Sequence, residues 1–130
     1  MLGNFTYHNP TKLIFGKDAL ASLAAELAPY STIQLVYGSG SIRRFGIYNQ
    51  VVETLRAAGK TIVEDSGVMP NPTIEKLREG AQIARDNDVD FILAVGGGSC
   101  VDYAKAVAVS KDLPAGEDPW DVYFDRFEEP

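Results

Sequence analysis

The fold of this protein is decided by residues 90–105, which read DFILAVGGGSCVDYAK. The segment from Asp90 to Val95 is the most apolar of the predicted strands, which is typical of a central parallel strand covered on both faces. Three glycines and Ser99 follow, and the pattern then predicts a helix to about Ser110. The expected packing face of this helix consists of Val101, Ala104 and Ala108.

The same order of strand, turn and helix precedes this stretch. Strands are predicted at residues 32–37 and 60–64. Helices are predicted from a cap at Asp18 to Pro29, between Gly46 and Gly59, and after residues 70–73. In the last of these, Asn71 or Thr73 is expected to cap the helix, Pro72 to occupy its first position, and the buried stripe to be Ile74, Leu77, Ala81 and Ala84.

Two short extended segments, residues 5–8 and 12–15, lie on either side of a turn signal at Asn9-Pro10-Thr11 and predict an N-terminal hairpin or strand pair. The alternation of strands and helices predicts an α/β fold with an open, mostly parallel sheet. The pattern decays after Lys111 without a closing element. Residues 1–130 are therefore predicted as one domain that is incomplete at its C-terminal end.

Composition removes several classes of function. The chain of 130 residues carries 12 Lys and Arg against 18 Asp and Glu, a formal charge of −6, which disfavours nucleic acid as a partner. One cysteine forms no internal disulfide, and one histidine leaves too few ligands for a metal site. The sequence contains neither a run of ~20 apolar residues nor a signal peptide, so no membrane association is expected and a cytoplasmic location is predicted.

Two glycine-rich turns, Gly38 to Ser41 and Gly96 to Ser99, stand where a strand gives way to a helix. Glycine leaves the backbone open to an anion, and the first amides of a helix attract negative charge. Both turns are expected at the carboxyl ends of the strands, where α/β sheets bind ligands. A phosphate or pyrophosphate ligand is the resulting prediction.

Generic phosphate motifs are nevertheless incomplete. Arg43 and Val101 stand where a third glycine of G-x-G-x-x-G would be, and no Lys-Ser/Thr pair follows either turn as in a Walker loop. Tight turns without a ligand remain the alternative, above all for the first turn. In the second, Ser99, Asp102 and Lys105 are spaced i, i+3 and i+6, so Asp102 either serves a site or simply pairs with the helix dipole and Lys105.

Other conspicuous residues have structural explanations. Cys100 is expected to be a small packing residue. Trp120 and Tyr123 are expected to anchor a surface loop, the alternative being that they flank a substrate channel. The acidic residues from Glu117 to Glu129 are expected to form a solvated tail.

Five motifs run in order over nearly the whole chain: NPTKLIFG (9–16), YGSGS (37–41), PNPT (70–73), AVGGGS (94–99) with Asp102 and Lys105, and DPW (118–120). With these motifs the chain resembles the N-terminal part of the iron-containing (group III, metal-dependent) alcohol dehydrogenases. The resemblance is strongest to their butanol-dehydrogenase-like branch of NADPH-dependent aldehyde reductases. It implies a Rossmann-like domain of the type found at the N-terminus of dehydroquinate synthases. The triple-glycine turn alone is shared with glycerol dehydrogenases and dehydroquinate synthases.

The resemblance also implies roles for individual residues. Gly97, Gly98 and Ser99 would bind the cofactor pyrophosphate, and Asp102 would lie near the nicotinamide. Gly38, Ser39, Gly40 and Ser41 would meet the adenosine ribose, and Asn71 would border the adenine pocket. Because residues 38–41 contain no acid and Arg43-Arg44 follow, NADP(H) is predicted; a Rossmann residue count would instead nominate Glu64 or Asp65 as a ribose acid and predict NAD.

Catalysis in the family uses a divalent metal, iron or zinc, held by an Asp and several His in a helical second domain. That domain is absent from this chain, so no catalytic or metal-binding residue is predicted here and the chain alone is expected to be inactive. The full-length enzyme is expected to be a homodimer acting on small alcohols and aldehydes. The alternatives are a stand-alone, non-catalytic nucleotide-binding module and the N-terminal part of a glycerol dehydrogenase or dehydroquinate synthase relative.

Overall fold

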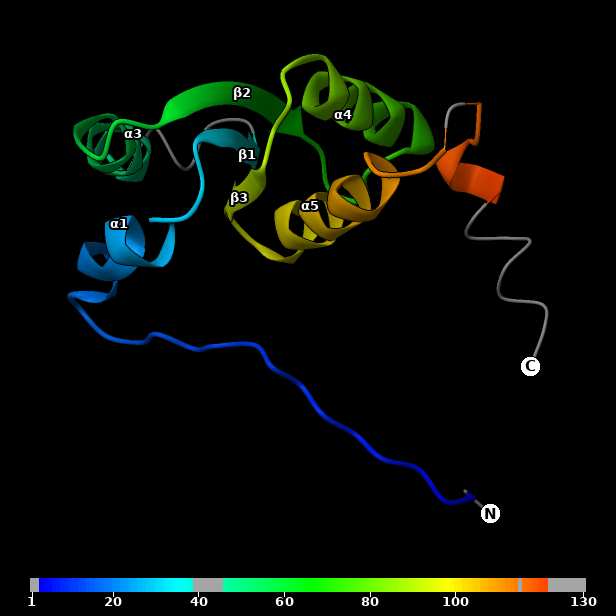
Figure 1. Ribbon diagram of the computed structural model, residues 1–130, viewed down its shortest axis with the longest axis horizontal. Helices are drawn as coiled ribbons and strands as arrows, with labels where there is room; N and C mark the ends of the chain where they lie inside the picture. The colour runs from blue at the N-terminus through cyan, green and yellow to red at the C-terminus, as the bar shows by residue number, and fades with distance from the viewer. Residues whose placement is uncertain (1–2, 39–45, 115, 122–130) are drawn as a thin grey trace.

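Three parallel strands form one open sheet in the computed structural model of the protein, which describes residues 3–38, 46–114 and 116–121. The strands are β1 (Thr32–Gly38), β2 (Thr61–Val68) and β3 (Phe91–Val95), in the order β2-β1-β3. The helices are α3 (Ile47–Ala57), α4 (Ile74–Asp86) and α5 (Gly98–Ser110), preceded by the 3-10 turn η1 (Ala19–Ser22) and the short α1 (Leu23–Glu26). The predicted α/β class with a parallel sheet is confirmed (Figure 1).

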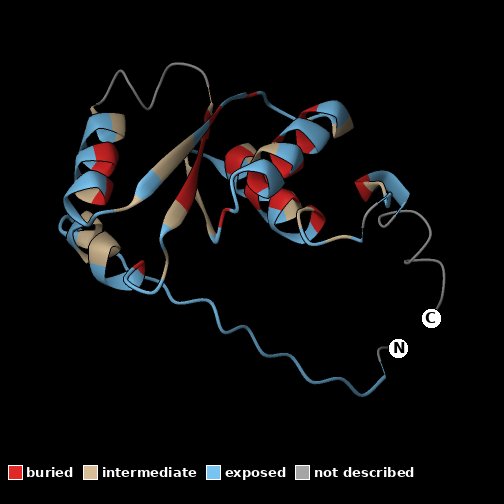
Figure 2. Cartoon of the chain, turned by 45° about the horizontal axis from the view of Figure 1, so that its top comes forward, coloured by how far each residue is buried: buried red, intermediate tan, exposed pale blue. Residues whose placement is uncertain are grey.

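The core lies on both faces of the central strand β1, whose residues Ile33 to Tyr37 are buried (Figure 2). On one face, Ile33, Leu35 and Tyr37 pack with α3 and with Leu27, which follows α1. On the other face, Val36 packs with residues of α4 and α5. The period-2 alternation of β1 therefore supplies one hydrophobic cluster to each helical layer.

β3 corrects one expectation. It was predicted to be the central strand, but within the described residues it lies at the edge of the sheet, and all five of its residues are half-buried. β1 takes the central place because β2 pairs with one of its edges and β3 with the other. The apolar composition of a strand indicates how much of its surface can be buried, but it does not determine its position in the order of strands.

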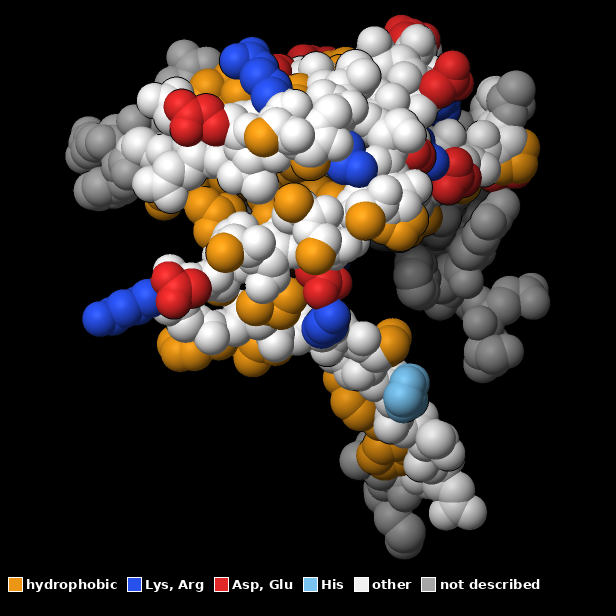
Figure 3. Space-filling view, turned by 60° about the vertical axis from the view of Figure 1, so that its left-hand side comes forward, with side chains coloured by type: hydrophobic (Ala, Val, Ile, Leu, Met, Phe, Trp, Pro, Cys, Tyr) orange, Lys and Arg blue, Asp and Glu red, His pale blue; other side chains and the backbone are white. Residues whose placement is uncertain are grey.

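The N-terminal strand pair is not formed. Residues 3–15 contain neither helix nor strand and extend away from the sheet with exposed hydrophobic side chains, among them Tyr7 and Phe15 (Figure 3). The turn signal does operate locally, because the Asn9 side chain accepts a hydrogen bond from the amide of Thr11 at 3.0 Å. A two-stranded hairpin is marginal without a surface to pack on, and residues 3–15 are exposed throughout, with Lys12 paired to Glu26 of α1 at 2.5 Å.

Several element boundaries also differ from expectation. Asp18 makes no side-chain cap, and its helix is reduced to η1 and α1. β2 runs four residues beyond Glu64, to Val68. Thr73 caps α4 as expected, but α4 begins at Ile74, so Pro72 lies before the helix and not at its first position.

Helix α5 has the predicted extent but a different buried face. Of its expected packing residues, Ala104 is buried, whereas Val101 and Ala108 are exposed. The residues that it buries are Cys100, Tyr103, Ala104, Val107 and Ser110. The buried arc is rotated because α5 packs against α4 as well as against the sheet.

Candidate functional site

The structure brings the ends of two glycine-rich turns to the same edge of the sheet. Tyr37 and Val95 are partners in the parallel β1–β3 ladder, so Gly38 and Gly96 follow directly after neighbouring strands. Ser39, Gly40 and Ser41 lie outside the described residues, as do Arg43 and Arg44. The described part of the first turn therefore consists of Gly38, which stands beside the second turn at the carboxyl ends of the strands.

Cys100 lies close to both Gly38 and Gly96. A Cβ added to Gly96 would lie 2.9 Å from the Cys100 Sγ, and one added to Gly38 would lie 3.1 Å from the Val68 carbonyl oxygen and 3.9 Å from the same Sγ. Gly96 also has a φ of +151°, which L side chains rarely adopt. These two glycines are required by packing, and Cys100 has the small packing role expected of it.

The next two glycines face open space. A Cβ at Gly97 or Gly98 would have no atom of another described segment within 4 Å, so the described part of the chain leaves the backbone here uncovered. Gly97 is the N-cap of α5 and has no side chain to bond the first amides of the helix. The amide of Cys100 donates to the Gly97 carbonyl oxygen at 3.1 Å, whereas the amides of Gly98 and Ser99 come too early in the helix for an i−4 acceptor within it and lie at the positive end of its dipole. The turn combines room with hydrogen-bond donors, the two properties that a phosphate group requires.

Asn71 lies in the loop that follows β2, the other neighbour of β1. Its φ is +53°, a left-handed conformation that asparagine tolerates better than most residues. Because β2 is parallel to β1, this loop leaves the sheet at the same edge as the two glycine turns. The described residues Gly38, Asn71 and Gly97 to Ser99 thus share one edge.

Asp102 and Lys105 do not form one constellation with Ser99. Asp102 lines a cavity of about 250 Å³ between α4 and α5, together with Thr73, Leu77, Tyr103 and Trp120. Lys105 instead lines the groove between α5 and β3. The carboxylate of Asp102 and the ammonium group of Lys105 therefore line two different hollows, although they are only three residues apart in α5.

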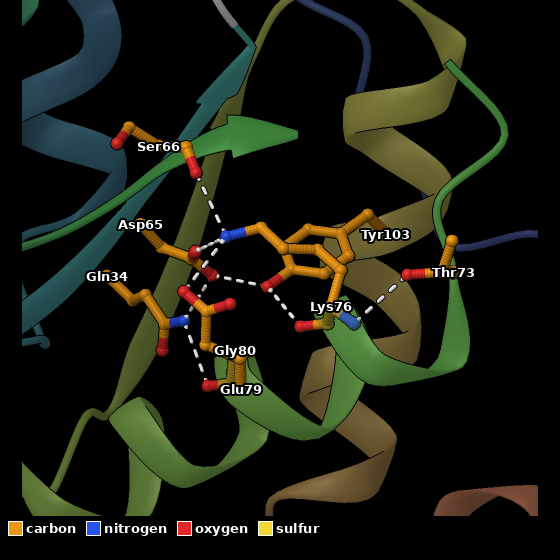
Figure 4. Close-up of polar contacts among 8 residues, drawn as sticks. All are labelled: Gln34, Asp65, Ser66, Thr73, Lys76, Glu79, Gly80 and Tyr103. Carbon is orange, nitrogen blue, oxygen red and sulfur yellow. Dashed lines mark hydrogen bonds and ion pairs between the residues drawn. The ribbon is translucent and has the colours of Figure 1, made fainter. Parts of the chain in front are cut away.

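A buried polar cluster next to this edge was missed by the reasoning from sequence (Figure 4). The side chain of Asp65, in β2, is fully buried and accepts hydrogen bonds from three elements. Lys76 Nζ donates to Asp65 Oδ1 at 2.9 Å, and the Tyr103 hydroxyl and Gln34 Nε2 donate to Oδ2 at 2.6 and 2.9 Å. Gln34 Nε2 also donates to the Gly80 carbonyl oxygen at 3.1 Å, while its Oε1 is buried without a partner.

Charges in this cluster stabilise one another. Burial opposes the charged form of Lys76, but the hydrogen bond and the negative charge of Asp65 outweigh it, so the pKa of Lys76 is raised. Burial, and then the hydrogen bond to Asp65, raise the pKa of the Tyr103 hydroxyl. Lys76 and Gly80 lie among the buried residues of α4 although neither belongs to the apolar stripe, so the hydrophobic pattern carries no signal for this cluster.

Glu64 and Asp65, the two acids that a Rossmann residue count would nominate, already have partners. The Tyr48 hydroxyl, from α3, donates to Glu64 Oε1, and this bond with burial raises the pKa of Tyr48 to about 12. Asp65 belongs to the buried cluster. Asp65 is therefore not available as an acceptor at the sheet edge, and in the exposed Glu64 one carboxylate oxygen, Oε1, already accepts from Tyr48.

The C-terminal loop is attached to α4 by an ion pair. Arg78 donates from Nε and Nη2 to the two carboxylate oxygens of Asp118, at 3.0 and 2.6 Å. Trp120 follows and lines the cavity that contains Asp102. The loop that contains Trp120 is thus also held by Asp118, two residues earlier, through its two hydrogen bonds with Arg78. Tyr123 lies outside the described residues.

Among the described residues, no group of three or more His, Cys, Asp or Glu side chains is arranged to hold a metal ion. His8 lies in the exposed extended segment. No helix in the described ranges is both long and apolar enough to cross a bilayer.

Comparison with known proteins identifies the family. The family model described as iron-containing alcohol dehydrogenase matches residues 10–129. The chain belongs to the iron-containing alcohol dehydrogenase family.

Among its relatives, "Probable NADH-dependent butanol dehydrogenase 1" of Bacillus subtilis is 48% identical over 120 residues, which is 92% of this chain and 30% of that protein. The NADPH-dependent aldehyde reductase YqhD of Escherichia coli is 36% identical over 121 residues, 93% of this chain and 31% of the relative. The chain thus spans about three tenths of the length of these relatives.

Solved structures of the family have the same fold. The NADH-dependent butanol dehydrogenase A of Thermotoga maritima superimposes with a TM-score of 0.88 at 40% identity, covering 96% of this chain and 31% of the other. The substrate- and cofactor-free aldehyde reductase YqhD also gives 0.88, at 35% identity, covering 98% and 33%. The resemblance seen in the sequence motifs is confirmed, and so is the Rossmann-like N-terminal fold.

Proposed function

We propose that this chain is the nucleotide-binding part of an NADP(H)-dependent alcohol dehydrogenase or aldehyde reductase. In the full-length protein it would hold the nicotinamide while hydride passes to or from a primary alcohol or aldehyde. Residues 1–130 would form one N-terminal domain that later residues complete. Membership of the iron-containing alcohol dehydrogenase family supports the class of reaction. The cofactor and the residues that bind it are proposed from the geometry and charge of the site.

The observation that carries the proposal is the turn from Gly96 to Ser99. Among the described residues, nothing fills the space beside Gly97 and Gly98, which stand at the N-terminus of α5 and at the carboxyl edge of a parallel sheet. A pyrophosphate fits this arrangement because its oxygens accept hydrogen bonds and its charge meets the positive helix end. We assign Gly97, Gly98 and Ser99 to it.

The neighbouring segments supply the rest of the nucleotide site. Gly38, Ser39, Gly40 and Ser41 would contact the adenosine ribose, and Asn71 would border the adenine. Asp102, one turn further along α5, would lie towards the nicotinamide. Two of these segments follow β1 and β2, which are neighbours in the sheet, and this order supports a nucleotide that crosses the strand ends.

The preference for NADP(H) is supported by the charges near the first turn. A ribose acid would repel a 2′-phosphate, but residues 38–41 contain no acid and Arg43-Arg44 follow. Glu64 and Asp65 are engaged by Tyr48 and Lys76. The relatives include both NADH- and NADPH-dependent enzymes, so we base the choice on these residues and not on the family.

A divalent metal, iron or zinc, would polarise the substrate oxygen when bound in the complete enzyme. The described residues of this chain do not fit such an ion, since they contain no cluster of suitable ligands. We therefore assign its ligands to a second domain and derive no step from it here. A homodimeric, cytoplasmic enzyme acting on small alcohols and aldehydes completes the proposal.

The test is a pair of binding titrations with the chain, followed by a turnover assay with the full-length protein. NADPH is expected to bind more tightly than NADH, and the full-length protein to reduce butanal with NADPH in a chelator-sensitive manner. Tighter binding of NADH would overturn the cofactor assignment, and metal-independent turnover would overturn the mechanism. Dinucleotide binding without any turnover by the full-length protein would instead favour a non-catalytic nucleotide-binding module.

A further inference from the structure

Lys76 is bonded to both ends of the loop that carries Asn71. Its Nζ donates to the Ser66 carbonyl oxygen at 2.9 Å, just before the loop, and its backbone amide donates to Thr73 Oγ1 at 3.2 Å, just after it. The side chain of Lys76 is 7% exposed, and both bonds are partly buried (Figure 4). One residue therefore fixes the distance between the two ends of this loop.

Asp65 connects this loop to the glycine turn. Its Oδ1 accepts from Lys76 Nζ, and its Oδ2 accepts from the Tyr103 hydroxyl at 2.6 Å. Tyr103 is four residues after Ser99 in the same helix, so a displacement of Tyr103 moves the first turn of α5 with it. Through Lys76 and Tyr103 the Asp65 carboxylate thus connects the Asn71 loop to the turn at Gly97 to Ser99, and these three residues are called the joint below.

Gly80 makes this joint possible. A Cβ at position 80 would lie 2.0 Å from the Tyr103 hydroxyl oxygen and 2.9 Å from Asp65 Oδ2. The φ of Gly80 is not positive, so the requirement for glycine comes from the close approach of Tyr103 and not from backbone conformation. α4 and α5 are therefore brought together specifically at the polar cluster.

We propose that the Asp65–Lys76–Tyr103 cluster sets the separation between the Asn71 loop and the Gly97 to Ser99 turn, and so controls dinucleotide affinity without contacting the dinucleotide. This inference rests on the proposed function, because it requires both segments to bind one ligand. A dinucleotide would contact both segments, so its affinity would depend on the distance between them. Adenosine lacks the pyrophosphate, so its affinity would not depend on the position of the Gly97 to Ser99 turn. The three residues act as positioning residues.

Two variants perturb the joint in different ways. Tyr103→Phe removes the hydroxyl and keeps the packed ring. Gly80→Ala keeps every polar group but places a methyl group against that hydroxyl, while raising the helix propensity of α4. Val107→Ala is the matched control, because Val107 is fully buried in the same helix but belongs to the hydrophobic cluster. Val107 shares that cluster with Tyr103 but has no polar group, so the variant loosens α5 while every hydrogen bond of the joint is kept.

The experiment measures dissociation constants of the three variants and the wild type for NADPH and adenosine, with thermal unfolding in parallel. For Tyr103→Phe and Gly80→Ala we expect affinity for NADPH to fall roughly tenfold and affinity for adenosine to stay within about twofold. For Val107→Ala we expect a lower melting temperature with NADPH affinity within about twofold of wild type.

Each other outcome overturns the inference. It is wrong if both joint variants bind NADPH as the wild type does, if NADPH and adenosine lose affinity equally, or if Val107→Ala shows the same selective loss. In these cases the proposed function stands, since the wild type binds. A wild-type chain that binds neither NADPH nor NADH refutes the proposed function, and the inference with it.

Discussion

Gly96, Gly97 and Gly98 are consecutive identical residues with different physical roles. Gly96 is held at a φ of +151° with the sulfur of Cys100 where its Cβ would be, whereas Gly97 and Gly98 have open space at that position. Stability should therefore depend on the first glycine and ligand access on the other two. The sequence GGG does not distinguish them, because the difference lies in what the third dimension puts beside each Cα.

Gly96→Ala is predicted to lower the free energy of unfolding by about 1–3 kcal/mol, because the new methyl group meets a disfavoured φ and the Cys100 sulfur together. Urea unfolding monitored by circular dichroism measures the change. A loss below ~0.5 kcal/mol would contradict the packing account, since this is the level of ordinary surface substitutions.

Gly97→Ala is predicted to have the opposite profile. Its φ of −85° suits alanine and the added Cβ meets no atom of another described segment, so stability should stay within ~0.5 kcal/mol of wild type. On the proposed function the methyl group occupies ligand space, and NADPH affinity should fall roughly tenfold in a fluorescence titration. Unchanged affinity would remove Gly97 from the assigned site.

Asp90 provides a pH-dependent contribution to stability. Its carboxylate accepts hydrogen bonds from the amides of Ser31 and Thr32, at distances from 2.8 to 3.1 Å, and these bonds lower the pKa of Asp90. A carboxyl group with a lowered folded-state pKa stabilises the fold above its unfolded-state pKa, about 3.9. The contribution disappears as the pH falls through the lower, folded-state pKa.

Asp90→Asn is therefore predicted to be less stable than wild type at neutral pH, with a gap that narrows in the acid range as the wild-type carboxyl becomes protonated. Urea unfolding at pH 7 and near pH ~2, well below the ordinary pKa of Asp, measures both gaps. Asp112→Asn, an exposed carboxylate paired with the adjacent Lys111, serves as the control and should show a smaller gap. A constant gap for Asp90→Asn would contradict the assignment.

At the scale of elements, the docking of α4 onto β2 depends on a buried ion pair. Asp65 is fully buried in β2, and Lys76 of α4 is its charged partner at 2.9 Å. A buried pair adds little stability over a hydrophobic one, but removing one member leaves an isolated charge away from water. The register of α4 on the sheet is then set by polar contacts as much as by the stripe at Leu77, Ala81 and Ala84.

Lys76→Met is accordingly predicted to cost about 3–5 kcal/mol of unfolding free energy, because it strands the Asp65 carboxylate. The double variant Asp65→Asn with Lys76→Met should recover a large part of this loss, since the amide keeps an acceptor for Tyr103 and carries no charge. Chemical denaturation of the wild type, both single variants and the double variant gives the cycle. Additive losses would show that the two side chains do not interact.

At the scale of the whole molecule, the chain matches about three tenths of the length of its relatives, and the described residues hold no metal cluster. We predict that the chain of residues 1–130 binds NADPH but gives no butanal-dependent oxidation of NADPH, even with added Fe²⁺ or Zn²⁺. Absorbance at the nicotinamide band measures turnover, and the full-length protein is the positive control. Turnover by the chain alone would place the catalytic groups within these 130 residues.

Much of this architecture could be predicted from the sequence, and particular residues show where prediction ended. The sequence narrows the cap of α4 to Asn71 or Thr73, and the structure selects Thr73, because capping depends on a local hydrogen bond from the amide three residues on. The prediction of a hairpin at residues 5–15 was wrong. The turn at Asn9 forms its local hydrogen bond, but this bond does not make the two flanking segments pair as strands. Lys76 was missed because its partner is 11 residues away in sequence and on another element.

The sequence by itself determined the α/β class, the two glycine turns and the family, because periodicity, glycine placement and motif order are properties of neighbouring residues. Tertiary structure alone decided that β1 is the central strand, that Gly80 is required for the approach of Tyr103, and that Asp65 and Glu64 already have partners. The physical reason is that strand order, burial and pairing depend on groups far apart in the chain. Their meeting is fixed by the packing of the entire sheet and its helices.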